Sequence, residues 1–136
     1  MAKRTKRAAQ AKVLNIAEVD WQLLPDHFDG AYSKLLFGPE TEHGTLIDYR
    51  ISSYQPKGYV ARHSHKTMEQ IYHVLDGEGV MELSGERQVV RRHDVIFIPP
   101  GIDHSIMNTG LDDLVFLVIT VPVSYTHLRA HETGIN

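Results

Sequence analysis

The stretch of residues 44–121 is a succession of short apolar segments separated by turn signals, and this pattern restricts the possible folds more than any other feature. Apolar and polar residues alternate within these segments with the period of two that β-strands show. Pro99-Pro100-Gly101 stops a strongly apolar segment, because proline has no amide hydrogen to donate and glycine permits a sharp bend. No pattern with a helical period competes here. The stretch therefore predicts an all-β sandwich or barrel, with strands at 45–54, 59–65, 69–75, 80–84, 87–91, 94–98, 104–109 and 114–121.

Two histidines one residue apart lie in the predicted strand 59–65. Side chains of a strand alternate between its faces, so His63 and His65 are expected to point the same way and to share one ion. Imidazole suits Zn, Fe, Ni and Cu, and Mn less selectively. Such a pair is common by chance, and the longer pattern around it carries the interpretation.

That longer pattern resembles the two signature motifs of the cupin superfamily. Gly58, the His63/His65 pair and Gln70 correspond to the first motif, and Pro99-Pro100-Gly101, His104 and Asn108 correspond to the second. The resemblance covers residues 44–121. It implies a double-stranded β-helix, a jelly-roll barrel with a pocket at its open mouth, and an association into homodimers. It also implies one divalent transition metal ion (Fe, Mn, Ni or Zn), with the ligands His63, His65, Gln70 and His104.

Gln70 departs from the family pattern, in which glutamate is usual. A ligand set without a carboxylate rules out the two-histidine, one-carboxylate triad of many non-haem iron oxygenases. Neutral ligands would also leave the ion its full double charge, which would make it a stronger Lewis acid. The alternative is that three histidines hold the ion, with water or substrate completing the coordination.

Tyr72 shares a strand face with Gln70 and is a candidate catalytic residue, as an acid or hydrogen-bond donor. The alternative role is a buried aromatic wall. His73 is expected on the opposite face. The apolar candidates for the pocket lining depend on strand register, because a shift of one residue reverses each face; they are Tyr49, Ile51, Tyr72, Met81, Leu83 and Phe97.

Three further positions carry expectations about structure. His93 stands where the second motif usually has glycine, so a positive φ is expected there. Asn108 is interpreted as a hydrogen-bonding turn residue and not as a ligand. His27 lies outside both motifs and is expected at the surface.

The two ends of the chain differ from its centre. Five of the 14 basic residues, and none of the 17 acidic ones, lie at positions 1–12, which we interpret as a disordered basic tail. Residues 13–43 are apolar enough to form an N-terminal arm with one or two strands on the barrel or on a second subunit. Residues 123–133 resemble a translated sequencing-library adapter. We therefore interpret 122–136 as an artefact and exclude its histidines from any site.

Composition places the chain among ordinary globular proteins. It has 136 residues, enough for one domain, and no cysteine, which excludes disulfides and a thiol nucleophile. No apolar run is long enough to cross a membrane, and the acidic centre argues against nucleic-acid binding. A bacterial, cytoplasmic protein is expected. The favoured function is a metalloenzyme, a dioxygenase or an isomerase or lyase, acting on a small oxygen-rich molecule. The alternatives are a non-catalytic binding or sensing module and a metal-free structural barrel.

Overall fold

A computed structural model describes residues 10–43 and 46–123. Within them, the only helical element is one 3-10 turn, and the rest of the regular structure consists of strands. The elements are η1 (Ile16–Glu18), β1 (His27–Phe28), β2 (Ala31–Phe37), β3 (Asp48–Tyr54), β4 (Tyr59–Val60), β5 (Met68–Asp76), β6 (Glu78–Leu83), β7 (Glu86–Arg91), β8 (Val95–Ile98), β9 (His104–Asn108) and β10 (Leu114–Pro122).

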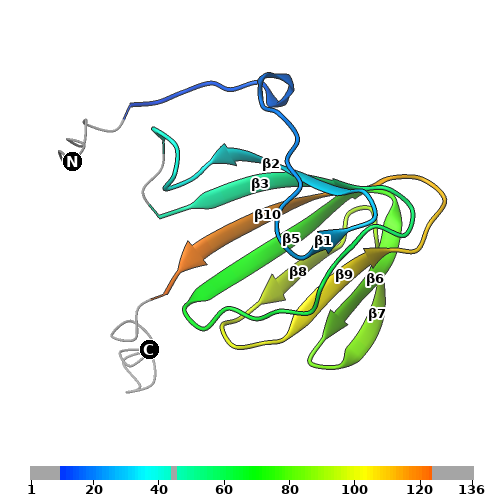
Figure 1. Cartoon of the computed structure of the whole chain (residues 1–136). Coiled ribbons are helices and arrows are strands. Elements are labelled where there is room, and N and C mark those ends of the chain that lie inside the picture. Colours follow the sequence, from blue (N-terminus) through cyan, green and yellow to red (C-terminus); the bar gives the residue numbers. More distant parts are fainter. Residues whose placement is uncertain (1–9, 44–45, 124–136) are drawn as a thin grey trace, which may run out of the picture.

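The strands form two five-stranded antiparallel sheets that face each other (Figure 1). One sheet has the order β2-β3-β10-β5-β8 and the other β1-β4-β9-β6-β7. From β3 to β10 the chain passes from one sheet to the other at every step except the β6–β7 hairpin, which produces the double-stranded β-helix. The prediction of an all-β jelly roll is confirmed.

The core lies between the inner faces of the two sheets. Along β5, burial alternates with the strand period, so Tyr72 and Val74 point inward while Ile71 and Leu75 point outward. The central strand β10 repeats the pattern and pairs with both β3 and β5. Burying this apolar surface is the main stabilising term, at roughly 25 cal/mol per Å². The core residues include Tyr54, Val60, Met81, Val90, Ile98, Ile106, Leu114 and Phe116.

Turns follow the local sequence closely. His93, in the turn between β7 and β8, has a φ of +79°, as expected for a position usually held by glycine. Gly77 has a φ of +81° in the tight connection of β5 to β6, and its amide donates to the Asp76 carboxylate. Glycine adopts this left-handed conformation without steric cost, whereas histidine is strained by it.

The predicted strand 59–65 is shorter than expected. Regular pairing in β4 ends at Val60, and after it the amide of Ala61 donates to the Asp26 carbonyl of the N-terminal segment. His63 instead forms an isolated antiparallel bridge with His104, through two backbone hydrogen bonds of 3.0 and 2.8 Å. Backbone pairing between His63 of the first motif and His104 of the second therefore brings the two motifs together.

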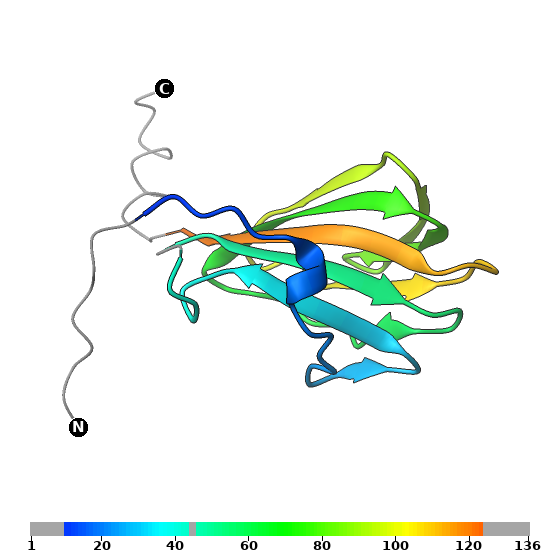
Figure 2. The same cartoon turned by 90° about the horizontal axis from the view of Figure 1, so that it is seen from above.

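The N-terminal segment packs along β2, with η1 lying beside that strand (Figure 2). Gln22 bridges Ser33, and the Lys34 ammonium donates to the Ile16 carbonyl. At the other end, Pro122 pairs with Met68 and belongs to β10, so the segment interpreted as an artefact overlaps the sheet by this residue. The remaining predictions for residues 1–9 and 124–136 fall outside the described residues.

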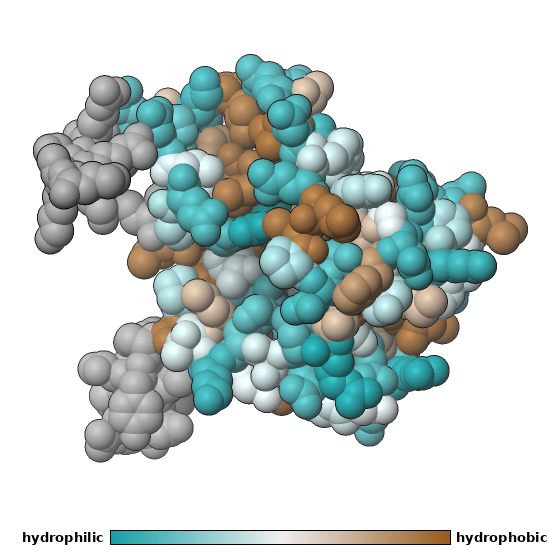
Figure 3. Space-filling view, in the orientation of Figure 1, coloured by the Kyte–Doolittle hydropathy of each residue, from teal (hydrophilic) through white to brown (hydrophobic). Residues whose placement is uncertain are grey.

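The surface of the molecule is mixed. In the space-filling view, apolar side chains form small groups that are interrupted by hydrophilic ones (Figure 3). None of the helical structure in the described part of the chain is long and apolar enough to span a lipid bilayer.

Candidate metal centre

Three histidines converge at one end of the space between the sheets. His63 and His65 follow β4, and His104 begins β9. One ring nitrogen from each lies within 4.8 Å of the others. The ring centroids of His63 and His104 are 4.2 Å apart, and those of His63 and His65 are 5.1 Å apart. Three ring nitrogens this close to one another form a group that could hold one metal ion.

Backbone carbonyls set the tautomer of two of these rings. Nδ1 of His63 lies 2.8 Å from the Ala61 carbonyl, and Nδ1 of His104 lies 2.9 Å from the Ile102 carbonyl. Because a carbonyl only accepts, each Nδ1 carries the proton, and each Nε2 presents its lone pair. Metal-ligating histidines in proteins are usually oriented in this way.

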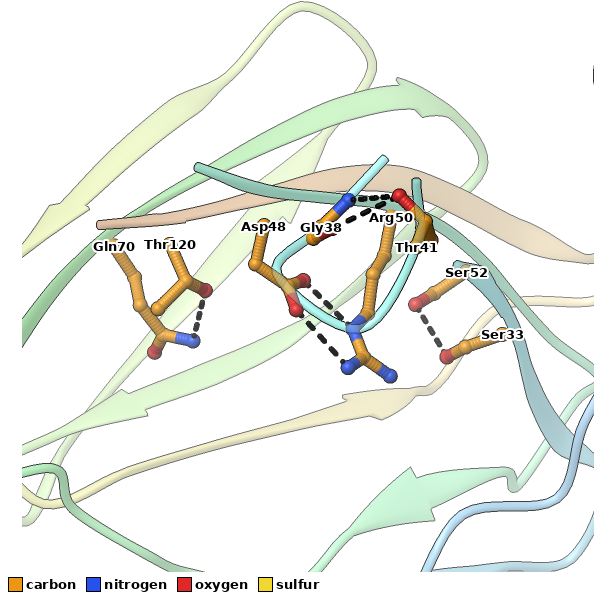
Figure 4. A network of polar contacts seen from close by, with 8 residues as sticks. All are labelled: Ser33, Gly38, Thr41, Asp48, Arg50, Ser52, Gln70 and Thr120. Atoms are coloured by element: carbon orange, nitrogen blue, oxygen red, sulfur yellow. Dashed lines mark hydrogen bonds and ion pairs between the residues drawn. The ribbon is translucent and has the colours of Figure 1, made fainter. Parts of the chain in front are cut away.

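Two buried side-chain atoms of the described residues have no hydrogen-bond partner, namely Gln70 Oε1 and His104 Nε2. The Gln70 amide nitrogen donates to Thr120 Oγ1 at 3.0 Å, which leaves its oxygen free (Figure 4). An unsatisfied buried polar atom costs about 1–3 kcal/mol. Both atoms belong to residues that the resemblance to the cupin motifs implies as ligands. A donor set of imidazole nitrogens and an amide oxygen fits a divalent transition metal ion.

The electrostatics of the cluster favour the neutral form of two of its rings, those of His104 and His65. Burial, together with the neighbouring His63 and His65, lowers the pKa of His104 to about 4, against the opposing effect of the Ile102 carbonyl. Burial, followed by the proximity of His63, also lowers the pKa of His65. Since a metal binds only unprotonated imidazole, these two rings are ready to act as ligands at neutral pH.

His63 and His65 line a cavity of about 690 Å³ between the sheets. Tyr72 forms part of its wall, stacked on Phe116 with centroids 5.5 Å apart and edge-on to His104 at 6.0 Å. Burial raises the pKa of the Tyr72 phenol, which therefore stays protonated. Further lining residues are Leu24, Pro25, Asp26, His27, Ser33, Asp48, Arg50, Ser52, Tyr54, Val60, Met68, Gln70, Val118 and Thr120.

The predicted lining was wrong for most of its members. Tyr72 lines the cavity as predicted. On β3, Asp48 and Arg50 line the cavity, and the predicted Tyr49 and Ile51 do not. The register of β3 decides this, because Asp48 lies opposite Thr120, on the inner face of β10. Met81 and Leu83 belong to the apolar core, and Phe97 is 57% exposed.

His27 is the cavity residue that the sequence did not reveal. It was expected at the surface, but it is half-buried, lies edge-on to Tyr54 at 6.0 Å and lines the cavity. Its Nδ1 donates to the Pro25 carbonyl at 2.8 Å, which leaves Nε2 as an acceptor. Burial, and to a smaller extent His63, lowers its pKa. No local pattern marks this residue, because folding of the N-terminal segment over the barrel places it here.

Two other expectations agree with the structure. His73 lies on the outward-facing side of β5, opposite to Gln70 and Tyr72. Asn108 is buried and fixes a turn: its amide nitrogen donates to the Tyr54 and Asp112 carbonyls, each at 2.8 Å, and its oxygen accepts from the Gly110 amide.

Comparison with known proteins agrees with this geometry. Residues 50–120 match the family described as Cupin domain. The chain is 34% identical over 86 residues to the Oxalate-binding protein of Thermotoga maritima, covering 63% of this chain and 71% of that protein. It is 42% identical over 65 residues to Uncharacterized protein MJ1618 of Methanocaldococcus jannaschii, which is 48% of this chain. The chain spans about half the length of that relative, 51%.

Solved structures show the same fold. A crystal structure described as a predicted oxalate decarboxylase from Thermotoga maritima superposes with a TM-score of 0.75 at 27% identity, covering 82% of this chain and 100% of that one. KdgF from Halomonas sp. superposes with a TM-score of 0.70 at 19% identity, covering 86% of this chain and 98% of that one.

Proposed function

Since this chain belongs to the cupin family, we propose that it is a metal-dependent enzyme acting on a small oxygen-rich molecule. The ligands of one divalent transition metal ion (Fe, Mn, Ni or Zn) are Nε2 of His63 and His104, a ring nitrogen of His65, and Oε1 of Gln70. The observation that carries the proposal is the pair of orphaned buried atoms, Gln70 Oε1 and His104 Nε2, beside a cavity large enough for a substrate.

The neutral ligand set determines the kind of molecule that the site attracts. The metal-binding cluster found in the described residues consists of histidines alone. When bound, the ion supplies a Lewis acid of undiminished positive charge that polarises coordinated oxygen atoms. Carboxylate or enolate oxygens are the matching ligands, in line with the Oxalate-binding protein among the relatives.

Two further side chains are placed to handle protons. The protonated Tyr72 hydroxyl is a hydrogen-bond donor in the cavity wall, and we propose it as the catalytic acid. His27 presents an unprotonated Nε2 in the same cavity and acts as a base. Together they support proton transfer in isomerase or lyase chemistry, and they also accommodate dioxygenation.

A second candidate function is a non-catalytic binding module. It is favoured by the 34% identity to a protein named for binding oxalate. The same ligands would hold the ion, and Tyr72 would then contribute affinity only. Replacing Tyr72 with phenylalanine separates the two functions. In an enzyme the change lowers the rate of turnover at unchanged metal content, whereas a binding module shows no turnover with or without it.

The first experiment is elemental analysis of the untagged full chain after expression with Fe, Mn, Ni and Zn supplied. We expect close to one ion per chain, and its loss in a His63→Ala/His104→Ala double variant. His73→Ala, on the outward face of β5, is the matched control and should retain the ion. Protein that stays metal-free after reloading would refute the proposal.

The homodimer that the resemblance implies is part of the proposal. Sedimentation velocity at micromolar concentration measures it directly. A species of 15.4 kDa, the mass of one chain, would contradict it.

A further inference from the structure

Six polar side chains cross the inner face of the sheet at positions that are usually apolar in packed sheets. Gln70, Thr120 and Asp48 lie opposite one another on β5, β10 and β3. Arg50 follows Asp48 on the same face of β3, and Ser52 lies opposite Ser33 of β2. Figure 4 shows them as a row that starts at Gln70, one of the proposed metal ligands. All six line the cavity: Ser33, Asp48, Arg50, Ser52, Gln70 and Thr120.

These side chains are paired with each other, which makes their burial tolerable. Arg50 donates to both carboxylate oxygens of Asp48, at 2.8 and 3.1 Å, and the hydroxyls of Ser33 and Ser52 are 2.8 Å apart. The pairing leaves hydrogen-bonding capacity unused. A guanidinium has five N–H donors, of which two are engaged here, and each carboxylate and hydroxyl oxygen has further lone pairs.

The unused groups are both donors and acceptors, and their net charge is zero. Because Asp48 neutralises Arg50, a second anionic group of a ligand would meet the Asp48 carboxylate as well as the guanidinium. A hydroxyl group donates and accepts at once and matches this row better. The aromatic faces of Tyr54, Tyr72 and Phe116 line the same cavity and suit the C–H side of a polyol chain.

The cavity volume agrees with a ligand that extends beyond the ion. A volume of 690 Å³ holds about twenty water molecules, at roughly 30 Å³ each. Oxalate has six heavy atoms and would occupy only the part beside the histidines.

We propose that the ligand is a polyhydroxylated carboxylate: its carboxylate end faces the ion, and its hydroxyl groups bind the Asp48–Arg50 and Ser33–Ser52 pairs. This proposal rests on the proposed function, since it takes the metal site as one end of the ligand. It adds the substrate class, which neither the family nor the oxalate-binding relative supplies.

The test is calorimetric titration of the Zn²⁺-loaded full chain with three acids that share an α-hydroxycarboxylate end. Glycolate has no tail, 2-hydroxyhexanoate has an apolar tail, and gluconate has a polyol tail. We expect gluconate to bind at least about tenfold more tightly than either of the others, a difference of about 1.4 kcal/mol.

A double variant, Asp48→Asn/Arg50→Gln, removes both charges while keeping polar side chains at both positions. It should reduce the advantage of gluconate to about twofold and leave glycolate binding and zinc stoichiometry unchanged. The control is Arg62→Gln/Glu82→Gln, an ion pair of 2.8 Å outside this cavity, which should leave all three affinities as they are.

The possible failures are distinguishable. If glycolate binds and gluconate binds no more tightly, this inference is overturned and the proposed function stands. The inference also fails if 2-hydroxyhexanoate binds as tightly as gluconate, because the tail would then occupy an apolar surface. If the chain takes up none of Fe, Mn, Ni and Zn, both proposals are overturned.

Discussion

His104 makes the stability of the metal-free protein depend on pH below neutrality. Its side chain is 1% exposed, and its pKa is lowered from 6.5 to about 4, chiefly by burial. The unfolded chain therefore takes up a proton as the pH falls through 6.5, whereas the folded chain does so only near pH 4. The free energy of unfolding decreases across this window, and above pH 6.5 the residue has no effect. A shift of about 2.5 units, at 1.36 kcal/mol per unit, amounts to about 3 kcal/mol.

The assay is urea denaturation of EDTA-treated protein at pH 7 and pH 4, for the wild type and for His104→Asn. The pKa values of His27 and His65 are also lowered, and the carboxylates titrate as well, so only the difference between the two proteins isolates His104. We expect the wild type to lose about 3 kcal/mol more than the variant. Equal losses would refute the reasoning. An NMR titration of the His104 ring, with a midpoint near pH 6.5, would refute it without any variant.

Three further predictions concern single residues. Thr120→Val removes the acceptor that orients the Gln70 amide, so zinc affinity measured by competition with a chelator should fall about tenfold. Thr120→Ser keeps the acceptor and should keep the affinity; equal zinc affinities of the Thr120→Val variant and the wild type would exclude this orienting role. Asn108→Ala removes three hydrogen bonds, one of them buried and two partly buried, and should lower the free energy of unfolding in urea by about 3 kcal/mol. A loss below about 1 kcal/mol would contradict that account. His93→Gly relieves a strained φ of +79° and should raise the free energy of unfolding by up to about 1 kcal/mol, whereas the control Arg92→Gly should lower it. A destabilised His93→Gly protein would show that backbone strain is not the dominant effect.

Strand alternation in the sequence was sufficient for the all-β class, and the resemblance to the cupin motifs supplied the jelly-roll fold and the three histidines that converge on the candidate metal centre. Several details depend on local signals. Strand alternation places Gln70 and Tyr72 on the inward face of β5, and Pro99-Pro100-Gly101 ends the strand before His104. The positive φ of His93 follows from its own turn. Such features are determined by near neighbours along the chain, so they are legible without the tertiary structure.

The composition of the cavity was decided by tertiary structure. Which face of β3 points inward depends on its register with β10, and this register replaced the expected Tyr49 and Ile51 with Asp48 and Arg50. His27 reaches the cavity because β1 pairs with β4, where His27 lies opposite Val60 and the Asp26 carbonyl accepts from the Ala61 amide. Both results depend on hydrogen bonds between segments distant in sequence. A one-residue change of register would reverse which side chains the ligand meets, and no local pattern of residues encodes that choice.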